Sequence, residues 1–131
     1  MGRVIHFQIH SDNPEASIAF YEGLFGWEFR LWDGPLEYWN IITGEASEEG
    51  IDGGMIRRQG PAPTDGQPVN AYACTVDVAD IDSTLEKAVA LGAKIAVPKM
   101  EVQGVGWLAY LTTPEGNILG VMECFPEAHS A

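Results

Sequence analysis

The chain has 131 residues, 46% of them hydrophobic, which is enough to bury one core and gives no reason to expect two domains. Seven basic and nineteen acidic side chains give a formal charge of -12, a field that repels nucleic acid and anionic membranes. No apolar run approaches the roughly 20 residues of a membrane span, and no signal-peptide pattern is present. We therefore expect a single cytoplasmic domain over residues 1–131 with a small molecule as its partner.

The first predicted element is a strand over residues 4–10. Polar and apolar side chains alternate along it, which is the period of a β-strand with two different faces. The apolar face is expected to pack against a helix. The other face carries Val4, His6, Gln8 and His10.

A helix is predicted directly after this strand. Asn13 can cap its N-terminus, and Pro14 fits the first helical position, where its missing N–H costs nothing. Gly26 can adopt the left-handed conformation that ends a helix. The apolar stripe of this helix consists of Ile18, Phe20, Tyr21, Leu24 and Phe25.

Three further strands complete the first half of the chain. Their branched and aromatic residues are bounded by turn residues and by an acidic loop. They are predicted over residues 27–32, 38–43 and 51–58. The first module, about residues 4–58, therefore has the order βαβββ. Residues 59–68 contain three prolines and two glycines and are predicted to be a linker.

The second half, about residues 69–125, repeats this order. A strand over residues 69–78 precedes a helix that Asp80 can cap and Gly92 ends. Three more strands are predicted over residues 94–97, 106–112 and 117–125. A shift of roughly 66 or 67 positions lays the first helix on the second. The identity between the aligned side chains is low, so the repeat is one of architecture.

The repeat predicts an α+β fold in which two βαβββ modules form a cupped mixed β-sheet cleft with the helices on the outside. One helix leaves one face of its sheet uncovered, and pairing two modules encloses that face. The two cysteines, Cys74 and Cys124, are too few for a disulfide framework, so we expect reduced thiols.

Several short motifs resemble one family. They are Ala19-Phe20-Tyr21, Leu24-Phe25-Gly26-Trp27, Val97-Pro98-Lys99, Gly104-Val105-Gly106-Trp107 and Thr113-Pro114-Glu115-Gly116-Asn117. Together they resemble the vicinal oxygen chelate superfamily of glyoxalases, bleomycin resistance proteins and dioxygenases, and within it the short branch related to lactoylglutathione lyase. The resemblance implies the paired-module fold, a homodimer, and a divalent metal that acts as a Lewis acid on two neighbouring substrate oxygens.

In this family the first and last strands of each module supply the metal ligands. By resemblance His6 matches the first of these positions. The others fall near Ala73, at Gly120 and within residues 53–55, and none of these is an ordinary ligand. A catalytic cation normally has three protein ligands. We therefore expect no cofactor, with His6 as the only matched ligand position; a divalent metal is the alternative.

The strand face that carries two imidazoles is the candidate catalytic centre. His6 and His10 can transfer protons, and Gln8 between them can bind a ligand. The alternative is that His6 is a hydrogen-bonded wall residue and His10 lies in solvent. Glycines on inward strand positions would leave room for a ligand, whereas strand aromatics and methionines also serve as core. The candidate ligand-binding residues are Gln8, Trp39, Met55, Ala73, Trp107, Gly120 and Met122.

Three functions are compatible with these observations. The leading hypothesis is a superfamily protein that binds a small polar organic ligand in its cleft without the usual metal. The second is a metal-dependent glyoxalase I-like lyase or isomerase, or a dioxygenase, with a nonstandard ligand set that includes His6. The third is a protein that sequesters a ligand without catalysis, for which the acidic charge favours cations.

Overall fold

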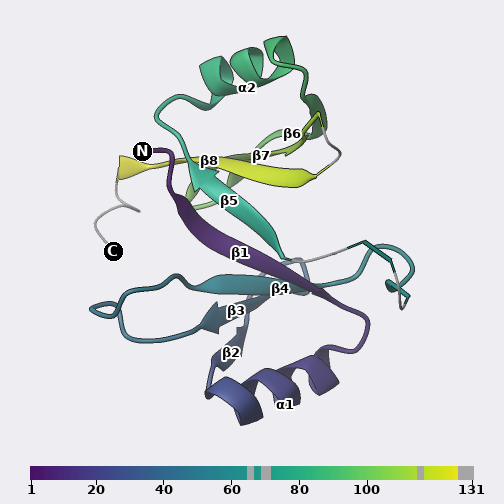
Figure 1. Cartoon of the computed structure of the whole chain (residues 1–131). Helices are drawn as coiled ribbons and strands as arrows, with labels where there is room; N and C mark the ends of the chain where they lie inside the picture. Colours follow the sequence, from purple (N-terminus) through teal and green to yellow (C-terminus); the bar gives the residue numbers. More distant parts are fainter. Residues whose placement is uncertain (65–66, 69–71, 115–116, 127–131) are drawn as a thin grey trace. The chain divides into compact units, whose positions relative to one another are not determined.

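A computed structural model describes residues 1–64, 67–68, 72–114 and 117–126 (Figure 1). Its contacts divide the chain into a first module, His6–Tyr72, and a second module, Met1–Ile5 with Ala73–Ala131. The elements are β1 (Val4–Ser11), α1 (Pro14–Phe25), β2 (Glu28–Leu31), β3 (Trp39–Ile42), β4 (Gly53–Arg57), β5 (Ala73–Asp77), α2 (Ile81–Ala90), β6 (Lys94–Val102), β7 (Gly106–Thr112) and β8 (Ile118–Cys124). The predicted α+β fold with the βαβββ order is confirmed. The single domain and the shared cleft stay predictions.

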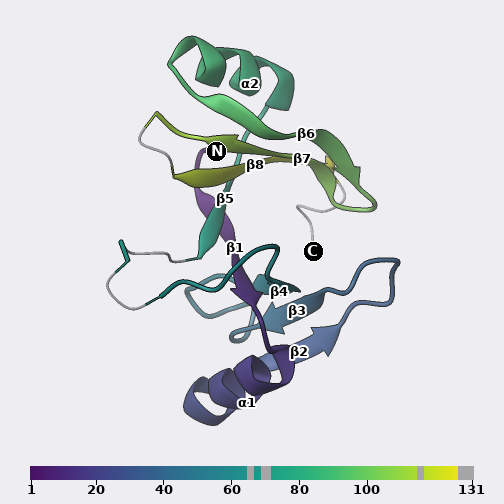
Figure 2. The ribbon, with the colours of Figure 1, turned by 90° about the vertical axis from the view of Figure 1, so that its right-hand side faces the viewer.

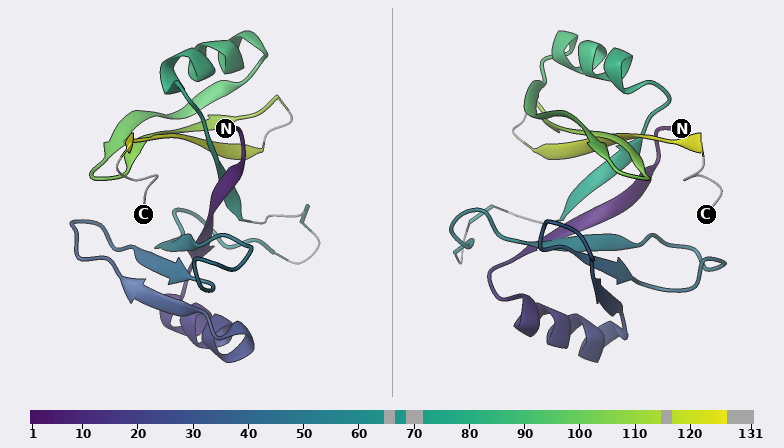
Figure 3. Two further views of the ribbon diagram at one scale, coloured as in Figure 1. Left: turned by 90° about the vertical axis from the view of Figure 1, so that its left-hand side faces the viewer. Right: turned by 180° about the vertical axis from the view of Figure 1, so that it is seen from behind.

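In the first module the strand order is β2-β3-β4-β1, with β1 parallel to β4 and the other pairs antiparallel. Helix α1 lies along this sheet (Figure 3). Asn13 accepts a hydrogen bond from the Ala16 N–H, Pro14 opens the helix, and Gly26 ends it with a φ of 75°. These are the three signals that the sequence contains for this helix, and all of them are confirmed.

The core of the first module lies between the sheet and α1. Its buried side chains are Phe7, Ile9, Ile41 and Met55, and Ile18 and Tyr21 of α1 pack against them. Side chains alternate along a strand. His6, Gln8 and His10, which flank Phe7 and Ile9 on β1, therefore point away from the helix. We call this side the polar face: it carries His6, Gln8 and His10 on β1, Asn40 on β3 and Gly54 on β4, with Tyr38 just before β3.

The second module repeats this architecture. Its strand order is β5-β8-β7-β6, with β5 parallel to β8 and the other pairs antiparallel. Helix α2 lies beside β6, β7 and β8 (Figure 2). Asp80 caps this helix by accepting from the Ser83 N–H. The buried core consists of Ile81, Ala109, Leu111 and Val121.

Most predicted strand ends lie within two residues of the observed ones, and the largest differences are in β6 and β5. Strand β6 continues through Pro98 to Val102, whereas the sequence predicted an end at Val97. It is an edge strand with register shifts on either side of Val97, and a proline is tolerated at such places because the missing N–H is not needed there. Strand β5 begins at Ala73; the first part of its predicted range, residues 69–71, lies outside the described residues.

Both cysteine thiols, at Cys74 and Cys124, are free and partly buried. Within the described residues, neither helix is long and apolar enough to cross a membrane.

Candidate functional site

The polar face of the first module is built by three adjacent strands. Gln8 on β1 lies beside Gly54 on β4, and Gly54 lies beside Asn40 on β3. His6 and Gln8 are half-buried, whereas His10 and Asn40 are exposed. The face therefore presents imidazole and amide groups from separate strands, with a gap in the side chains at Gly54.

Tyr38 fills this gap. A β-carbon added at position 54 would lie only 1.8 Å from the Tyr38 hydroxyl oxygen, so the tyrosine side chain lies directly over the glycine backbone. The hydroxyl and Nε2 of His6 are 3.2 Å apart, a hydrogen bond that joins residues 32 positions apart in the sequence. Only glycine at position 54 leaves room for this crossing.

The turn between β2 and β3 holds Tyr38 in place. Trp32 donates its backbone N–H to the Tyr38 carbonyl at 2.7 Å, and the two rings meet edge to face with centroids 6.4 Å apart. The Trp32 ring in turn lies against Gly34, where a β-carbon would collide with it. The turn that contains Gly34 therefore also directs the Tyr38 side chain toward His6.

The surroundings of His6 favour its neutral form. Burial lowers the pKa of His6 below its ordinary value of about 6.5, and the nearby Asp52 carboxylate opposes that shift. Asp52 is itself fixed, because its Oδ1 accepts from the Thr43 N–H at 2.8 Å and from the Thr43 hydroxyl at 3.2 Å. The imidazole is thus bonded to a tyrosine hydroxyl and feels the charge of a carboxylate that Thr43 holds.

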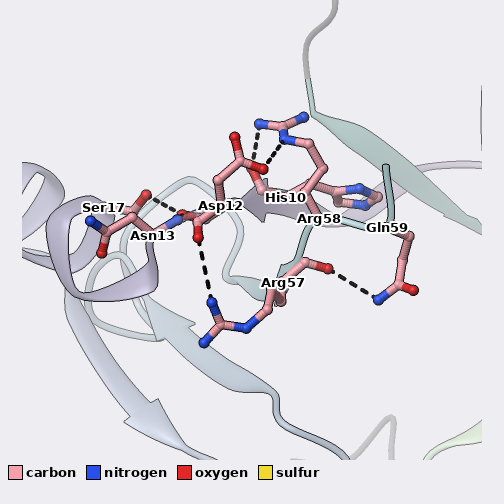
Figure 4. Close-up of polar contacts among 8 residues, drawn as sticks. His10, Asp12, Asn13, Ser17, Arg57, Arg58 and Gln59 are labelled. Carbon is pink, nitrogen blue, oxygen red and sulfur yellow. Dashed lines mark hydrogen bonds and ion pairs between the residues drawn. The ribbon is translucent and has the colours of Figure 1, made fainter. Parts of the chain in front are cut away.

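At the other end of β1, His10 lies beside an arginine (Figure 4). Arg58 donates from Nη2 to the His10 carbonyl at 3.0 Å and forms an ion pair with Asp12, also at 3.0 Å. Burial and the positive charge of Arg58 lower the pKa of His10. Nε2 of His10 lies 3.3 Å from Nε2 of Gln8. His6 and His10 thus belong to one strand face, and Gln8 lies between them.

Two of the predicted ligand-binding residues lie on the opposite face of the same sheet. Met55 has no exposed surface and Trp39 packs against the same core, directly beside Met55. Strand alternation separates both of them from His6. The structure therefore places Met55 and Trp39 in the core under α1, which corrects their expected position on the ligand side.

The other predicted residues belong to the second module. Ala73 is buried at the start of β5, and Met122 is half-buried on the Gly120 side of β8. Trp107 packs against the second core and carries the Lys99 ammonium 4.9 Å from its ring centroid. The space beside Gly120 was expected to be open, but the Thr75 hydroxyl lies 2.8 Å and the Tyr110 ring 3.0 Å from where a β-carbon would be. The glycines at 54 and 120 therefore admit side chains of this chain.

A family model matches residues 3–121 of the chain, and its description is Glyoxalase/Bleomycin resistance protein/Dioxygenase superfamily. The chain belongs to this superfamily. Two similar curated proteins are each named "Putative glyoxylase CFP32", one from Mycobacterium bovis and one from Mycobacterium tuberculosis. Each is 28% identical over 129 residues, which are 96% of this chain and 46% of the relative. The chain thus spans about half the length of these relatives.

Solved structures share the superfamily fold. Methylmalonyl-CoA epimerase from Mycobacterium tuberculosis has a TM-score of 0.62 and 13% identity, and the match covers 99% of this chain and 92% of the epimerase. A protein from Bacillus halodurans C-125 has a TM-score of 0.67 and 12% identity, with 95% of each chain covered. A superfamily member from Vibrio splendidus 12B01 has a TM-score of 0.61 and 15% identity, with 95% of this chain and 100% of that one covered. At these identities the likeness concerns the fold.

The donors present do not fit the divalent metal that the superfamily implies. Within residues 1–64, 67–68, 72–114 and 117–126, no three His, Cys, Asp or Glu side chains gather as a metal site requires. His6 is bonded to Tyr38, and Asp52 is held by Thr43. Glu123 is the carboxylate nearest to Gly120 in the sequence, but it faces α2 and accepts from the Ile81 N–H at 2.9 Å.

Tyr38 is the site residue that sequence reasoning missed. It precedes a four-residue strand, and its side chain reaches His6 diagonally across β4. The available signal was the pair of glycines at 53 and 54 in a strand, because a missing side chain indicates that another group approaches closely. Naming that group required the register of β3 on β4, which the sequence pattern does not give.

Proposed function

We propose that this protein binds a small polar organic molecule on the polar face of its first module, without the usual divalent metal. His6, Gln8 and His10 are the proposed contacts, as the sequence predicted, and Tyr38 joins them. The observation that carries the proposal is the Tyr38–His6 hydrogen bond over Gly54. It occupies Nε2 of the histidine that the family resemblance matches to a metal-ligand position.

This bond disfavours a cation at His6 for a physical reason. A metal on Nε2 would displace the Tyr38 hydroxyl from the hydrogen bond that it makes above Gly54. A hydrogen bond of this kind contributes about 0.5–1.5 kcal/mol to stability, and a bound cation would have to offset its loss. A catalytic cation normally has three protein ligands, and among the described residues His6 lacks two neighbours that could complete such a set. An organic molecule instead can add to the hydrogen bonds of the face and leave them in place.

The relatives support a small-molecule ligand and leave its identity open. Two of them are named as glyoxylases, and one neighbouring structure is an epimerase in complex with methylmalonyl-CoA. A coenzyme A ester carries several phosphate charges, which the charge of -12 on this chain repels. Arg30 and Arg58, on or beside the polar face, are both engaged in ion pairs. We therefore propose a ligand other than a coenzyme A ester.

The experiment that tests the proposal is a thermal-shift screen of EDTA-treated protein against metabolites and antibiotics. A ligand that binds the folded state raises the melting temperature by mass action. The expected result is at least one organic compound whose shift needs no metal and is lost in His6→Gln and reduced in Tyr38→Phe. Tyr110→Phe in the second module is the matched control and should keep the shift.

The metal-dependent alternative makes the opposite prediction. If manganese, iron, cobalt, nickel or zinc bound tightly at one equivalent and His6→Ala removed the binding, the metal-free proposal would be wrong. Turnover of methylglyoxal with a thiol in the presence of such a metal would then assign the glyoxalase I-like activity.

A homodimer and a cytoplasmic location also stay predictions, and sedimentation of the purified chain tests the first of them.

A further inference from the structure

The polar face differs from most ligand sites in its charge. Its central side chains come from β1, from β3 and from the residue before β3, and none of them is a carboxylate, an ammonium or a guanidinium. We call this set the neutral strip. It consists of His6, Gln8, His10, Tyr38 and Asn40.

Every group of the neutral strip both donates and accepts hydrogen bonds. Neutral imidazole has one N–H and one bare nitrogen, an amide has both an NH₂ and a carbonyl, and a phenol hydroxyl does either. Two contacts within the strip already use this property, between Tyr38 and His6 at 3.2 Å and between Gln8 and His10 at 3.3 Å. A ligand with alternating donors and acceptors can pair with such groups in either direction.

The charged residues around the strip are each occupied. Arg58 is paired with Asp12, Arg30 with Glu28, and Asp52 accepts two hydrogen bonds from Thr43. A charged group placed against the half-buried part of the strip, at His6, Gln8 and Tyr38, loses hydration and needs an opposite charge to replace it. The five side chains of the strip supply no such charge, and Arg58 and Arg30 would have to leave their ion pairs to supply one.

We propose that the ligand group bound by the neutral strip is an uncharged hydroxylated one, a polyol or sugar-like segment, held by paired hydrogen bonds. This inference rests on the proposed function, because it names the ligand class of the same face. The proposed ligand class differs from the one that the net charge of -12 alone would favour, which is cations.

The test uses three probes with one carbon skeleton. They are glycerol, which is neutral, glycerate, which is an anion, and serinol, which is a cation at pH 7. Each is titrated into the full chain at pH 7 and equal ionic strength, while the ring C–H signals of His6 and His10 are followed by NMR. The variants His6→Gln and His10→Gln assign these signals.

Glycerol is expected to shift both sets of ring signals saturably, with an affinity about three- to tenfold higher than that of either charged probe. Tyr38→Phe should weaken glycerol by a similar factor, since one hydrogen bond is worth about that much. Tyr110→Phe should leave the titration unchanged.

Tighter binding of serinol or glycerate at the same signals would overturn the neutral class and leave the proposed binding face in place. The absence of any shift with glycerol would also overturn it. The proposed function fails separately, if the metabolite screen finds only metal-dependent ligands.

Discussion

Each of the two modules packs a tyrosine over a glycine of its own sheet. In each, a glycine on the last strand lies under a tyrosine that reaches toward the first strand: Tyr38 crosses Gly54 to His6, and Tyr110 crosses Gly120 to Thr75. The register differs, because Tyr110 is directly opposite Gly120 whereas Tyr38 lies two residues from the partner of Gly54. In both modules the glycine therefore makes room for a tyrosine of the same module.

The group that each tyrosine reaches separates the modules. In the second module the partner is Thr75, which is buried, and the next inward residue, Asp77, accepts the Arg3 N–H at 2.9 Å. These groups hold the chain's own backbone and side chains. In the first module the partner is His6, and Gln8 and the exposed His10 lie on the same face of β1. A shared scaffold thus keeps its polar groups for structure in one half and presents them in the other.

The largest expected effect distinguishes the two methionines that the sequence assigned to one ligand site. Met55→Ala removes a side chain with no exposed surface and should lower the free energy of unfolding by about 2–5 kcal/mol. Met122 is half-buried, so Met122→Ala should cost clearly less. Urea denaturation of both variants measures the difference, and equal losses would show that the two positions are alike.

The glycine substitutions come next. Gly54→Ala and Gly120→Ala each place a β-carbon against a neighbouring side chain, and each should cost about 1–3 kcal/mol of stability. Only Gly54→Ala should also change the ring signals of His6, because it expels the Tyr38 hydroxyl. A His6 spectrum that stays unchanged in Gly54→Ala would refute the crossing of Tyr38 over this glycine.

The tyrosine hydroxyls should have smaller effects. Tyr38→Phe removes one hydrogen bond from a half-buried pair and is expected to lower the free energy of unfolding by about 0.5–1.5 kcal/mol. Tyr110→Phe removes the bond to Thr75 and should cost a similar amount. Ligand binding separates the two variants, since only the first should lose affinity; a loss in both would mean that the effect is general.

The smallest expected effect is on the pH dependence of stability. Because burial lowers the pKa of His6 in the folded state, the unfolded chain binds more protons below about pH 6.5. The stability is therefore complete above that pH and is lost as the pH falls through the folded-state pKa. Thermal unfolding of His6→Gln should show a shallower loss in this range than His10→Gln, and equal slopes would contradict the burial of His6.

The sequence predicted the elements well because their signals are local. The caps at Asn13 and Asp80 and the left-handed Gly26 depend on a few adjacent residues, and strand alternation separated His6 from Phe7 correctly. Strand β6 was cut short because Pro98 reads as a terminator unless the strand is known to be an edge.

The site was harder to predict, because its defining contact depends on register. Met55 is one position from Gly54, and nothing in the pattern of β4 says which of the two faces α1. Likewise, the empty position at Gly54 indicated a close approach but did not name the group that approaches. Tyr38 is found only once β3 is aligned on β4.

The response of His6 to a divalent metal tests the metal-free polar face most directly. Nickel is added to one equivalent at pH 7, and the ring signals of His6 are followed by NMR in the unmodified chain and in Tyr38→Phe. We expect the His6 signals to keep their positions and widths in the unmodified chain while Tyr38 remains bonded to Nε2. Signals that broaden or shift to saturation at one equivalent would contradict a metal-free face.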